Sequence, residues 1–444
     1  MQPQSPPDHP KPGRCAALPQ KSSPMAQSDS TGKPQSGIRG KCKLAFLVTF
    51  LASLGVPWIL SVVCCFLSLW IIIPAPTFSL LPVGIGAPEV SPWLVVMNVI
   101  ALLLVALRLQ SSWVYGVALG CSLLGLLLSL LPLLQFPTAN ACIAAAIEAE
   151  FGKEMLTAVP PISQVVRPHP FVWIDAFRGI ELPEVRIDRG IPFATVDGVN
   201  LTLNLYRPSS IGLHPAIAVI YGGAWQTGTP ANDETFSRYM AAQGYTVVTL
   251  DYRHAPQFRY PAQLEDVRTA LSFIQTHAET LEIDHQRVAL LGRSAGAHLA
   301  SLAAYGQIPL PIRAVVNYYG PTNLTEGYND PPVPDPIDTR TVLEAFLGGN
   351  PDQVPQLYQD ASPVNHVQPN LPPSLLVYPG RDHLVLPKFG RQLYEKLQAA
   401  GNQAILLEIP WAEHAFDAVF NGVTNQLALY YTERFLAWAL RELP

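Results

Sequence analysis

Thirty consecutive uncharged residues, from Leu44 to Ile73, constrain the possible folds of this chain more than any other feature of its sequence. Most of them are apolar, and the run exceeds the roughly 20 residues that cross the hydrocarbon core of a bilayer as a helix. A signal peptide also combines positive charge with an apolar stretch, but its apolar core is only about 7–15 residues long. We therefore expect an uncleaved membrane anchor, with a signal peptide as the alternative.

Two further apolar runs, Val90–Leu107 and Trp113–Leu134, follow the first one. They predict a tight helical hairpin, and three glycines in its second arm would allow close helix contact. These glycines are Gly116, Gly120 and Gly125. Residues 44–134 are then a transmembrane region of about three helices (44–73, 90–107 and 113–134). The alternative for the short middle run is a re-entrant or buried segment.

The distribution of basic residues predicts the orientation of this region. Residues 1–43 are rich in Pro, Ser, Gln and Lys and are expected to be a disordered tail. This tail carries seven Lys or Arg, whereas the loop at 74–92 carries none. Because basic segments stay on the cytoplasmic side, we expect an integral membrane protein with a cytoplasmic N-terminus. The C-terminal domain is then expected on the outer face, whether periplasmic, lumenal or extracellular.

Charge and cysteine content narrow the chemistry of the C-terminal part. The whole chain has a net charge of −5, but its basic N-terminal tail carries +5, so residues 135–444 carry −10. An acidic domain of this kind argues against a nucleic-acid partner. All six cysteines lie within the first 142 residues. A disulfide framework and a thiol nucleophile are therefore excluded from the C-terminal domain.

After an expected linker at 135–167, strand-like and helix-like segments alternate from residue 168 to residue 444. This alternation predicts an α/β domain with a mainly parallel sheet and helices on both faces. An Asp-Gly pair at 197–198 indicates a hairpin turn, and residues 321–373 interrupt the alternation as an insertion. The expected strands are 185–195, 201–206, 216–221, 246–250, 288–291, 314–318, 374–378 and 404–409.

The pentapeptide Gly-Arg-Ser-Ala-Gly (292–296) lies between an expected strand and an Ala-rich helix. A nucleophile elbow requires this context, because its serine occupies a strained turn where neighbouring Cβ atoms would clash. Ser294 is therefore the candidate nucleophile.

A serine needs a histidine as base and a carboxylate that fixes the histidine tautomer. Asp382 and His414 each follow an expected strand, in the order Ser, acid, His. The alternatives are His298, which is expected to pack inside a helix, and His383, which is expected at the rim. We interpret Ser294, Asp382 and His414 as a catalytic triad.

The segment Tyr-Gly-Gly-Ala-Trp (221–225) follows the third expected strand directly. Its glycines allow the backbone to approach an oxyanion, which backbone N–H groups stabilise. We expect Gly223, Ala224 and Ala295 to be the donors. The alternative is a simple glycine turn.

These motifs resemble those of the hormone-sensitive-lipase-like and related carboxylesterase branch of the α/β hydrolases. The resemblance covers residues 168–444 and rests on the segments at 221–225, 251–256 (Asp-Tyr-Arg-His-Ala-Pro) and 292–296, and on the contexts of Asp382 and His414. It implies an α/β-hydrolase fold, ester hydrolysis through an acyl-enzyme, and no metal or organic cofactor. Two positions depart from the family pattern: Tyr221 replaces the usual His, and Arg293 replaces a frequent Asp.

Together these features predict a membrane-anchored carboxylesterase or lipase-like enzyme that acts on a small-molecule or lipid ester. An amidase, peptidase or acyltransferase with the same triad is one alternative. A catalytically inactive binding or sensor module is another, since a fold does not fix a function.

Overall fold

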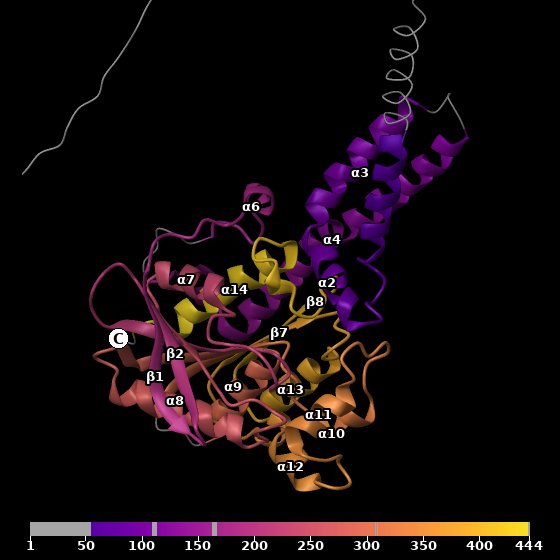
Figure 1. Ribbon diagram of the computed structural model, residues 1–444. Coiled ribbons are helices and arrows are strands. Elements are labelled where there is room, and N and C mark those ends of the chain that lie inside the picture. Colours follow the sequence, from indigo (N-terminus) through magenta and orange to yellow (C-terminus); the bar gives the residue numbers. More distant parts are fainter. Residues whose placement is uncertain (1–54, 109–112, 162–166, 307, 309, 443–444) are drawn as a thin grey trace, which may run out of the picture. The chain divides into compact units, whose positions relative to one another are not determined.

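The computed structural model describes residues 55–108, 113–161, 167–306, 308 and 310–442 (Figure 1). The expected basic tail and the start of the first apolar run lie outside these described residues. Residues 54–444 belong to one unit by their internal contacts, so the helices near its start and the sheet are described together.

The centre of the molecule is an eight-stranded sheet in the order β1-β2-β4-β3-β5-β6-β7-β8. The strands β1 and β2 are antiparallel to their neighbours, and all other pairs are parallel, as expected for an α/β-hydrolase fold. The bounds are β1 Arg186–Val196, β2 Val199–Arg207, β3 His214–Ile220, β4 Thr246–Leu250, β5 Ile283–Arg293, β6 Ile312–Tyr318, β7 Ser374–Pro379 and β8 Ala404–Ile409. Asp197 and Gly198, which join β1 to β2, both have positive φ, as the hairpin turn requires.

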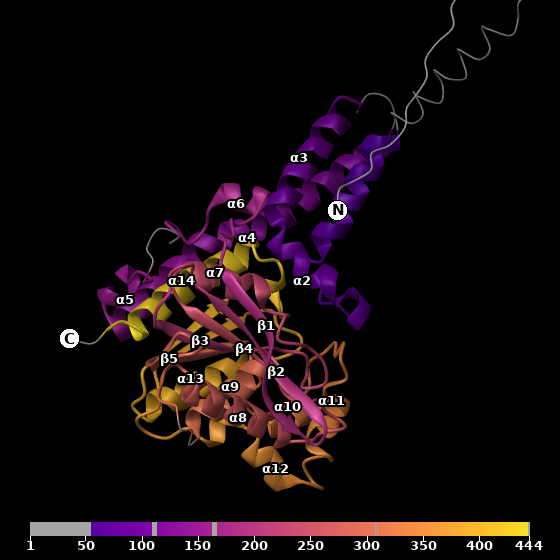
Figure 2. The same cartoon turned by 60° about the vertical axis from the view of Figure 1, so that its left-hand side comes forward.

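Helices cover both faces of the sheet (Figure 2). Alternate residues of β3 point into two separate apolar cores: Ala218 belongs to the core that includes residues of α8, α9 and α13, whereas Ile217 belongs to the core that includes residues of α7 and α14. This alternation follows from the period of two in a strand. The bounds are α7 Glu234–Ala242, α8 Ala262–Thr276, α9 Ala295–Tyr305, α13 Lys388–Ala399 and α14 Val423–Ala439.

The expected insertion at 321–373 consists of short helices that follow β6. They are α10 Leu324–Asn329, α11 Thr339–Leu347, α12 Pro355–Asp360 and the 3-10 helix η4 Pro363–Asn365. Phe346 and Tyr358 are buried in the same core as α8 and α9, so the insertion packs firmly onto the sheet domain.

Apolar helices precede the sheet domain. They are Gly55–Leu69, η1 Phe78–Leu80, α2 Leu81–Glu89, α3 Ser91–Ala106 and α4 Val114–Phe151. Of the described helices, α4 alone is long and apolar enough to cross a bilayer by itself, and η1/α2 together with α3 form a pair bent by 80° that also qualifies. The prediction of a loop at 74–92 is wrong in part, because the helix α2 forms within this segment and buries Leu81 and Ala87.

The expected linker at 135–167 is also wrong in part. The helix α4 continues to Phe151, and α5 (Lys153–Thr157) follows it. The continuation is Ala-rich, which favours a helix, and an apolar stripe of period four packs against the sheet domain. The buried members of this stripe are Ala139, Ile143, Ile147 and Phe151.

Small and polar side chains join the apolar helices. The Asn98 side-chain amide donates a hydrogen bond to Ser68 Oγ (3.1 Å), and Ser122 Oγ lies 2.8 Å from Ser61 Oγ. A Cβ atom at Gly125 would lie 2.3 Å from Asn98 Oδ1, so this glycine permits the close contact. The same expectation for Gly116 and Gly120 is wrong, since a Cβ at either would meet no described atom within 4 Å.

Hydrogen bonds at both ends of one segment connect these helices to the sheet domain. The carboxylate of Glu89, at the end of α2, accepts from the backbone N–H of Thr424 (2.9 Å) at the start of α14. The Arg381 guanidinium donates to the carbonyl of Ile72 (2.5 Å). The segment between residues 72 and 89 is therefore held against the sheet domain at both of its ends.

Candidate active site

Ser294 lies on a sharp turn between β5 and α9, with φ of 52° and ψ of −122°. A non-glycine residue adopts this conformation only where its surroundings impose it. The two glycines of the pentapeptide make the turn possible: a Cβ at Gly292 would lie 2.3 Å from the Gly296 carbonyl oxygen, and one at Gly296 would lie 2.0 Å from that of Ile220. This geometry is the one that a nucleophile elbow requires.

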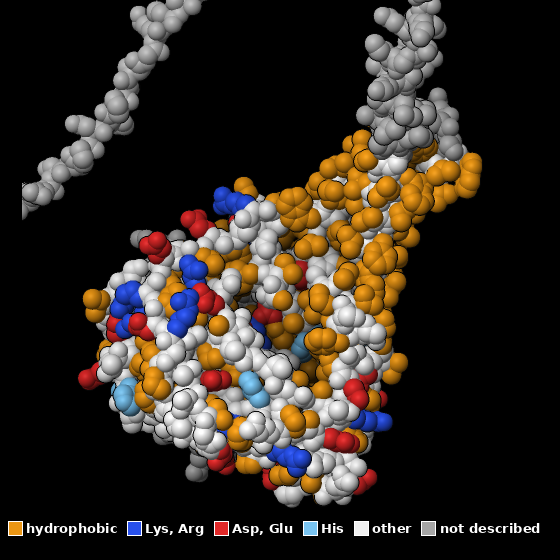
Figure 3. Space-filling model, viewed as in Figure 1, with side chains coloured by type: hydrophobic (Ala, Val, Ile, Leu, Met, Phe, Trp, Pro, Cys, Tyr) orange, Lys and Arg blue, Asp and Glu red, His pale blue; other side chains and the backbone are white. Residues whose placement is uncertain are grey.

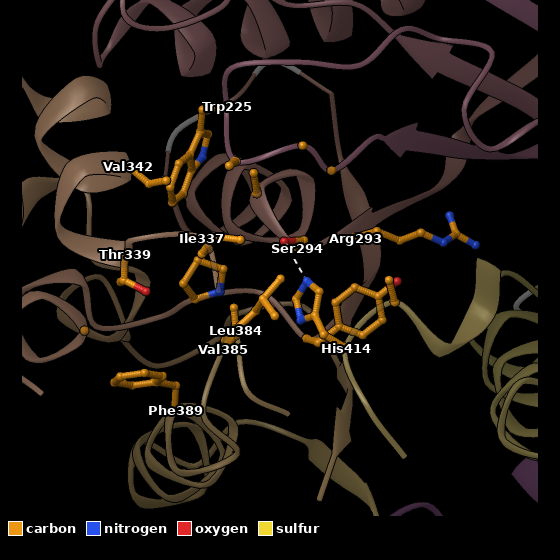
Figure 4. A pocket seen from close by; sticks show the side chains of 18 of the residues that line it. Trp225, Arg293, Ser294, Ile337, Thr339, Val342, Leu384, Val385, Phe389 and His414 are labelled. Carbon is orange, nitrogen blue, oxygen red and sulfur yellow. Dashed lines mark hydrogen bonds between the residues drawn. The ribbon is translucent and has the colours of Figure 1, made fainter. Parts of the chain in front are cut away.

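The structure brings Ser294, His414 and Asp382 into one hydrogen-bonded row. Figure 4 shows the contact between Ser294 and His414. His414 Nε2 lies 3.0 Å from Ser294 Oγ, and His414 Nδ1 lies 2.8 Å from Asp382 Oδ2. The three residues follow β5, β8 and β7 at the carboxyl edge of the sheet. Asp382 Oδ1 in turn accepts from the backbone N–H groups of Leu384 and Val385, both at 2.8 Å.

The surroundings of His414 favour its protonated form. Burial alone would lower the pKa of this imidazole, but the Asp382 carboxylate, with help from Glu413 and Asp417, outweighs burial and raises it. The Asp382 carboxylate therefore stabilises the positive charge that His414 acquires when its imidazole takes up a proton.

A second carboxylate organises both loops of the triad. Glu413 Oε1 accepts from the backbone N–H groups of His383 (2.8 Å) and His414 (3.0 Å), and Glu413 Oε2 lies 2.6 Å from His383 Nδ1. This contact raises the pKa of His383. His383 is therefore held at the triad by Glu413 and makes no contact with Ser294 among the described hydrogen bonds.

The backbone of Gly223 and Ala224 lies beside Ser294 in the same cavity, and so does Ala295. Gly223, Ala224 and Trp225 all have positive φ, so the loop is tightly wound after β3. A Cβ at Gly222 would lie 2.8 Å from the Arg293 carbonyl oxygen, which shows how closely the loop approaches the elbow. No hydrogen bond within the described part of the chain uses the N–H groups of Gly223, Ala224 or Ala295.

Tyr221, at the position where the family usually has His, braces this loop from behind. Its hydroxyl donates to Asp251 Oδ1 (2.8 Å) and lies 2.9 Å from His254 Nε2. Its ring stacks on Tyr252 with centroids 4.5 Å apart. The phenol thus forms the polar contacts that fix the start of the glycine loop.

Arg293, the second departure from the family pattern, is buried between two carboxylates. Its guanidinium pairs with Asp233 at 3.0 Å and with Asp417. The Tyr319 hydroxyl donates to the same Asp417, and the Tyr319 ring packs on His414 with centroids 4.5 Å apart. The residue before Ser294 is therefore connected to the loop that carries His414.

A cavity of about 500 Å³ opens over Ser294, and Figure 3 shows it as a hollow in the surface. Its size is within the range of sites for small organic ligands. Figure 4 shows that Val342, Ile337 and Phe389 lie on one side of Ser294 and Arg293 on the other. The side opposite Arg293 is therefore mostly apolar, with Thr339 among its residues.

His298 is expected to pack inside a helix and not to act as the base. His298 is fully buried, and its Nδ1 and Nε2 contact Trp225 Nε1 (3.2 Å) and the Ala361 carbonyl (2.6 Å), so it packs as expected. Within the described ranges, no group of three or more His, Cys, Asp or Glu side chains is placed to hold a metal ion.

The comparisons with known proteins agree with this architecture. The family model named BD-FAE matches residues 203–397. Esterase LipC of Mycobacterium tuberculosis is 31% identical over 244 residues, which cover 51% of this chain and 59% of LipC. The crystal structure of an esterase from Pyrobaculum calidifontis superposes with a TM-score of 0.51 at 20% identity, covering 70% of this chain and 94% of that one.

The chain has the α/β-hydrolase fold and is similar in sequence to carboxylesterases. A thermostable carboxylesterase from a metagenomic library, EstE1, has the same fold, with a TM-score of 0.50, 21% identity and coverage of 68% of this chain and 98% of EstE1. A probable isoprenylcysteine alpha-carbonyl methylesterase of Arabidopsis thaliana is 26% identical over 46% of each chain. The matches span only about half of the length of the curated relatives.

Sequence reasoning missed several residues at this site. His383 was named only as an alternative base, and Glu413, which directly precedes His414, was not singled out. The pairing of Arg293 with Asp233 and Asp417 had no local signal, because these residues are far apart in the sequence.

Proposed function

We propose that this protein is a membrane-anchored serine hydrolase that cleaves carboxylic esters through Ser294, His414 and Asp382. The observation that carries the proposal is the 3.0 Å contact between Ser294 Oγ and His414 Nε2, with Asp382 2.8 Å behind the imidazole. Hydroxyl and base at this distance are within reach of proton transfer.

In the proposed reaction, Ser294 Oγ attacks the ester carbonyl carbon while His414 Nε2 accepts the hydroxyl proton. Asp382 holds the imidazole by Nδ1 and stabilises its positive charge. The carbonyl oxygen becomes an oxyanion that the N–H groups of Gly223, Ala224 and Ala295 stabilise.

The tetrahedral intermediate then collapses. His414 returns the proton to the leaving alcohol, and an acyl-enzyme ester remains on Ser294. Water enters, gives a proton to His414 and attacks the acyl carbon. The second intermediate collapses as the bond from the acyl carbon to Ser294 Oγ breaks and His414 returns the proton to Oγ, which releases the acid and restores Ser294. These steps require no group beyond the side chains and backbone named here.

The membrane part of the proposal rests on the apolar helices. The 38 residues of α4 would be about 57 Å long at 1.5 Å per residue, longer than the roughly 30 Å hydrocarbon core. Its first half exposes apolar side chains such as Val117, Leu124 and Leu127, and its second half packs on the sheet domain. We infer that the first half spans the bilayer and that the catalytic domain lies on the outer face, with the basic N-terminus cytoplasmic.

The test of the catalytic proposal is hydrolysis of 4-nitrophenyl acetate by the full-length protein in detergent. We expect turnover by the wild type and a loss of about 10³-fold or more in the Ser294→Ala and His414→Ala variants. Equal turnover by all three proteins would refute the assignment. Product analysis with an added alcohol separates hydrolysis from acyl transfer, because transfer yields a new ester.

A further inference from the structure

We propose that the helical anchor supplies part of the substrate cavity through Phe78, and that the enzyme therefore takes esters with a long apolar chain that dissolve in the bilayer. This inference rests on the proposed function, because it names the class of ester that the same serine would cleave.

Phe78 is the first residue of η1, between the first apolar helix and α2. It lines the cavity that holds Ser294, and it is the sole described lining residue that precedes residue 222. Its side chain is 70% exposed. A residue that both lines a cavity and remains exposed lies at the mouth of that cavity, so the ring is an apolar part of the entrance.

The position of Phe78 is fixed from both sides. Arg381 holds the carbonyl of Ile72 and directly precedes Asp382, so the start of the segment is bound to the loop of the catalytic acid. Glu89 holds the start of α14 from the other end. The entrance ring and the reacting groups therefore belong to one connected structure within residues 54–444.

The segment around Phe78 has no charge that would repel an apolar chain. No Asp, Glu, Lys or Arg occurs from Leu44 to Pro88. A large exposed apolar residue next to helices of this kind favours contact with lipid or with an apolar ligand. A chain that lies in the bilayer beside these helices can reach the cavity along an apolar path.

The cavity continues this apolar path towards Ser294. One side is formed by Val342, Ile337 and Phe389, opposite the side that carries Arg293 (Figure 4). An ester with a long hydrocarbon chain would place the chain along the apolar side, with its inner end near Ser294 and its outer end against Phe78. A short ester would not extend to Phe78.

The difference between long and short esters gives the experiment. The full-length protein is reconstituted in phosphatidylcholine vesicles, and kcat/KM is measured for two pairs of esters. The first pair, 4-nitrophenyl dodecanoate and 4-nitrophenyl acetate, varies the acyl chain, and the second, dodecyl acetate and ethyl acetate, varies the alcohol chain.

For the Phe78→Ala variant we expect the long-to-short ratio of kcat/KM to fall about tenfold in one of the two pairs, because apolar contact in a hydrophobic site contributes discrimination of this order. Phe78→Leu should recover most of the ratio. The matched control is Phe66→Ala, since Phe66 is an exposed phenylalanine of the first apolar helix that does not line the cavity. Its ratio should stay within twofold of the wild type.

The outcomes separate this inference from the proposed function. If the wild type cleaves esters but neither ratio changes in Phe78→Ala, or if Phe66→Ala changes it equally, the role of Phe78 is refuted and the hydrolase assignment stands. If the wild type cleaves none of the four esters, the proposed function itself fails.

Discussion

Arg293, which directly precedes Ser294, forms an ion pair with Asp417, which lies three residues after His414. The guanidinium also pairs with Asp233, and the three side chains are each at least 90% buried. The pair therefore joins the turn of Ser294 to the loop of His414 through groups that are largely buried.

Removal of the Arg293 guanidinium should destabilise the folded protein. Arg293→Met leaves two buried carboxylates without their partner, and the expected loss in the free energy of unfolding is about 3–5 kcal/mol. Burial already raises the pKa of Asp233, and loss of the cation raises it further. Since a carboxyl with a raised folded-state pKa destabilises the fold as pH rises through that pKa, the loss should be larger at pH 8 than at pH 5.

Thermal unfolding in detergent at the two pH values measures this effect. Arg391→Met is the matched control, because Arg391 pairs with Glu408 in a half-exposed position and should cost little. An Arg293→Met variant as stable as Arg391→Met at pH 8 would contradict the interpretation.

The pH dependence of kcat/KM should depend on the charge of Glu413. The carboxylate of Glu413 contributes to the raised pKa of His414, and catalysis needs the neutral imidazole. Glu413→Gln removes this charge, lowers the pKa of His414 and should move the acidic limb of the kcat/KM profile to lower pH. Glu408→Gln, on strand β8, is the control and should leave the limb in place. A limb shifted to higher pH in Glu413→Gln would be inconsistent with the charge argument.

The third prediction concerns the brace behind the oxyanion loop. Tyr221→Phe removes the hydroxyl that contacts Asp251 and His254, so that Asp251 Oδ1 keeps only the N–H of Tyr252 and His254 Nε2 loses this contact, at a cost of about 1–3 kcal/mol. We expect kcat for 4-nitrophenyl acetate to fall about tenfold, because the loop loses its position. Tyr245→Phe serves as the control, since its buried hydroxyl has no hydrogen-bond partner in the described structure. Equal kcat values for the two variants would show that the Tyr221 hydroxyl does not position this loop.

Much of the sheet domain was predictable from the sequence because its signals are local. The expected strand at 246–250 coincides with β4, and Ser294, Asp382 and His414 were each indicated by the strand that precedes them. Parallel strands bring their carboxyl ends to one edge, so chain order alone implied that the three residues meet.

Other features depend on tertiary contacts and had no local signal. Residues 135–151 are helical in part because Ile143 and Ile147 find a partner surface on the sheet domain. Phe78 at the cavity mouth likewise depends on the contacts of Ile72 and Glu89 with distant segments. An apolar loop residue carries no pattern that indicates which surface it will meet.

The fourth prediction tests the connection between the apolar helices and the catalytic domain. Glu89 accepts from the backbone at the N-terminus of α14, and Glu89→Ala should lower the stability by about 1–2 kcal/mol, as for a lost helix cap. Glu89→Gln keeps an acceptor and should lose less. The midpoints of thermal unfolding should follow the order wild type, Gln, Ala, and an unchanged midpoint in Glu89→Ala would disprove a stabilising role.

The central claim is that Ser294 is a nucleophile activated by His414, and covalent labelling with a fluorophosphonate tests it most directly. After reaction of the folded full-length protein, peptide mass spectrometry should find the adduct on Ser294. The Ser294→Ala variant should remain unlabelled, and His414→Ala should react far more slowly. An adduct on another residue, or equal labelling of the wild type and Ser294→Ala, would contradict the account.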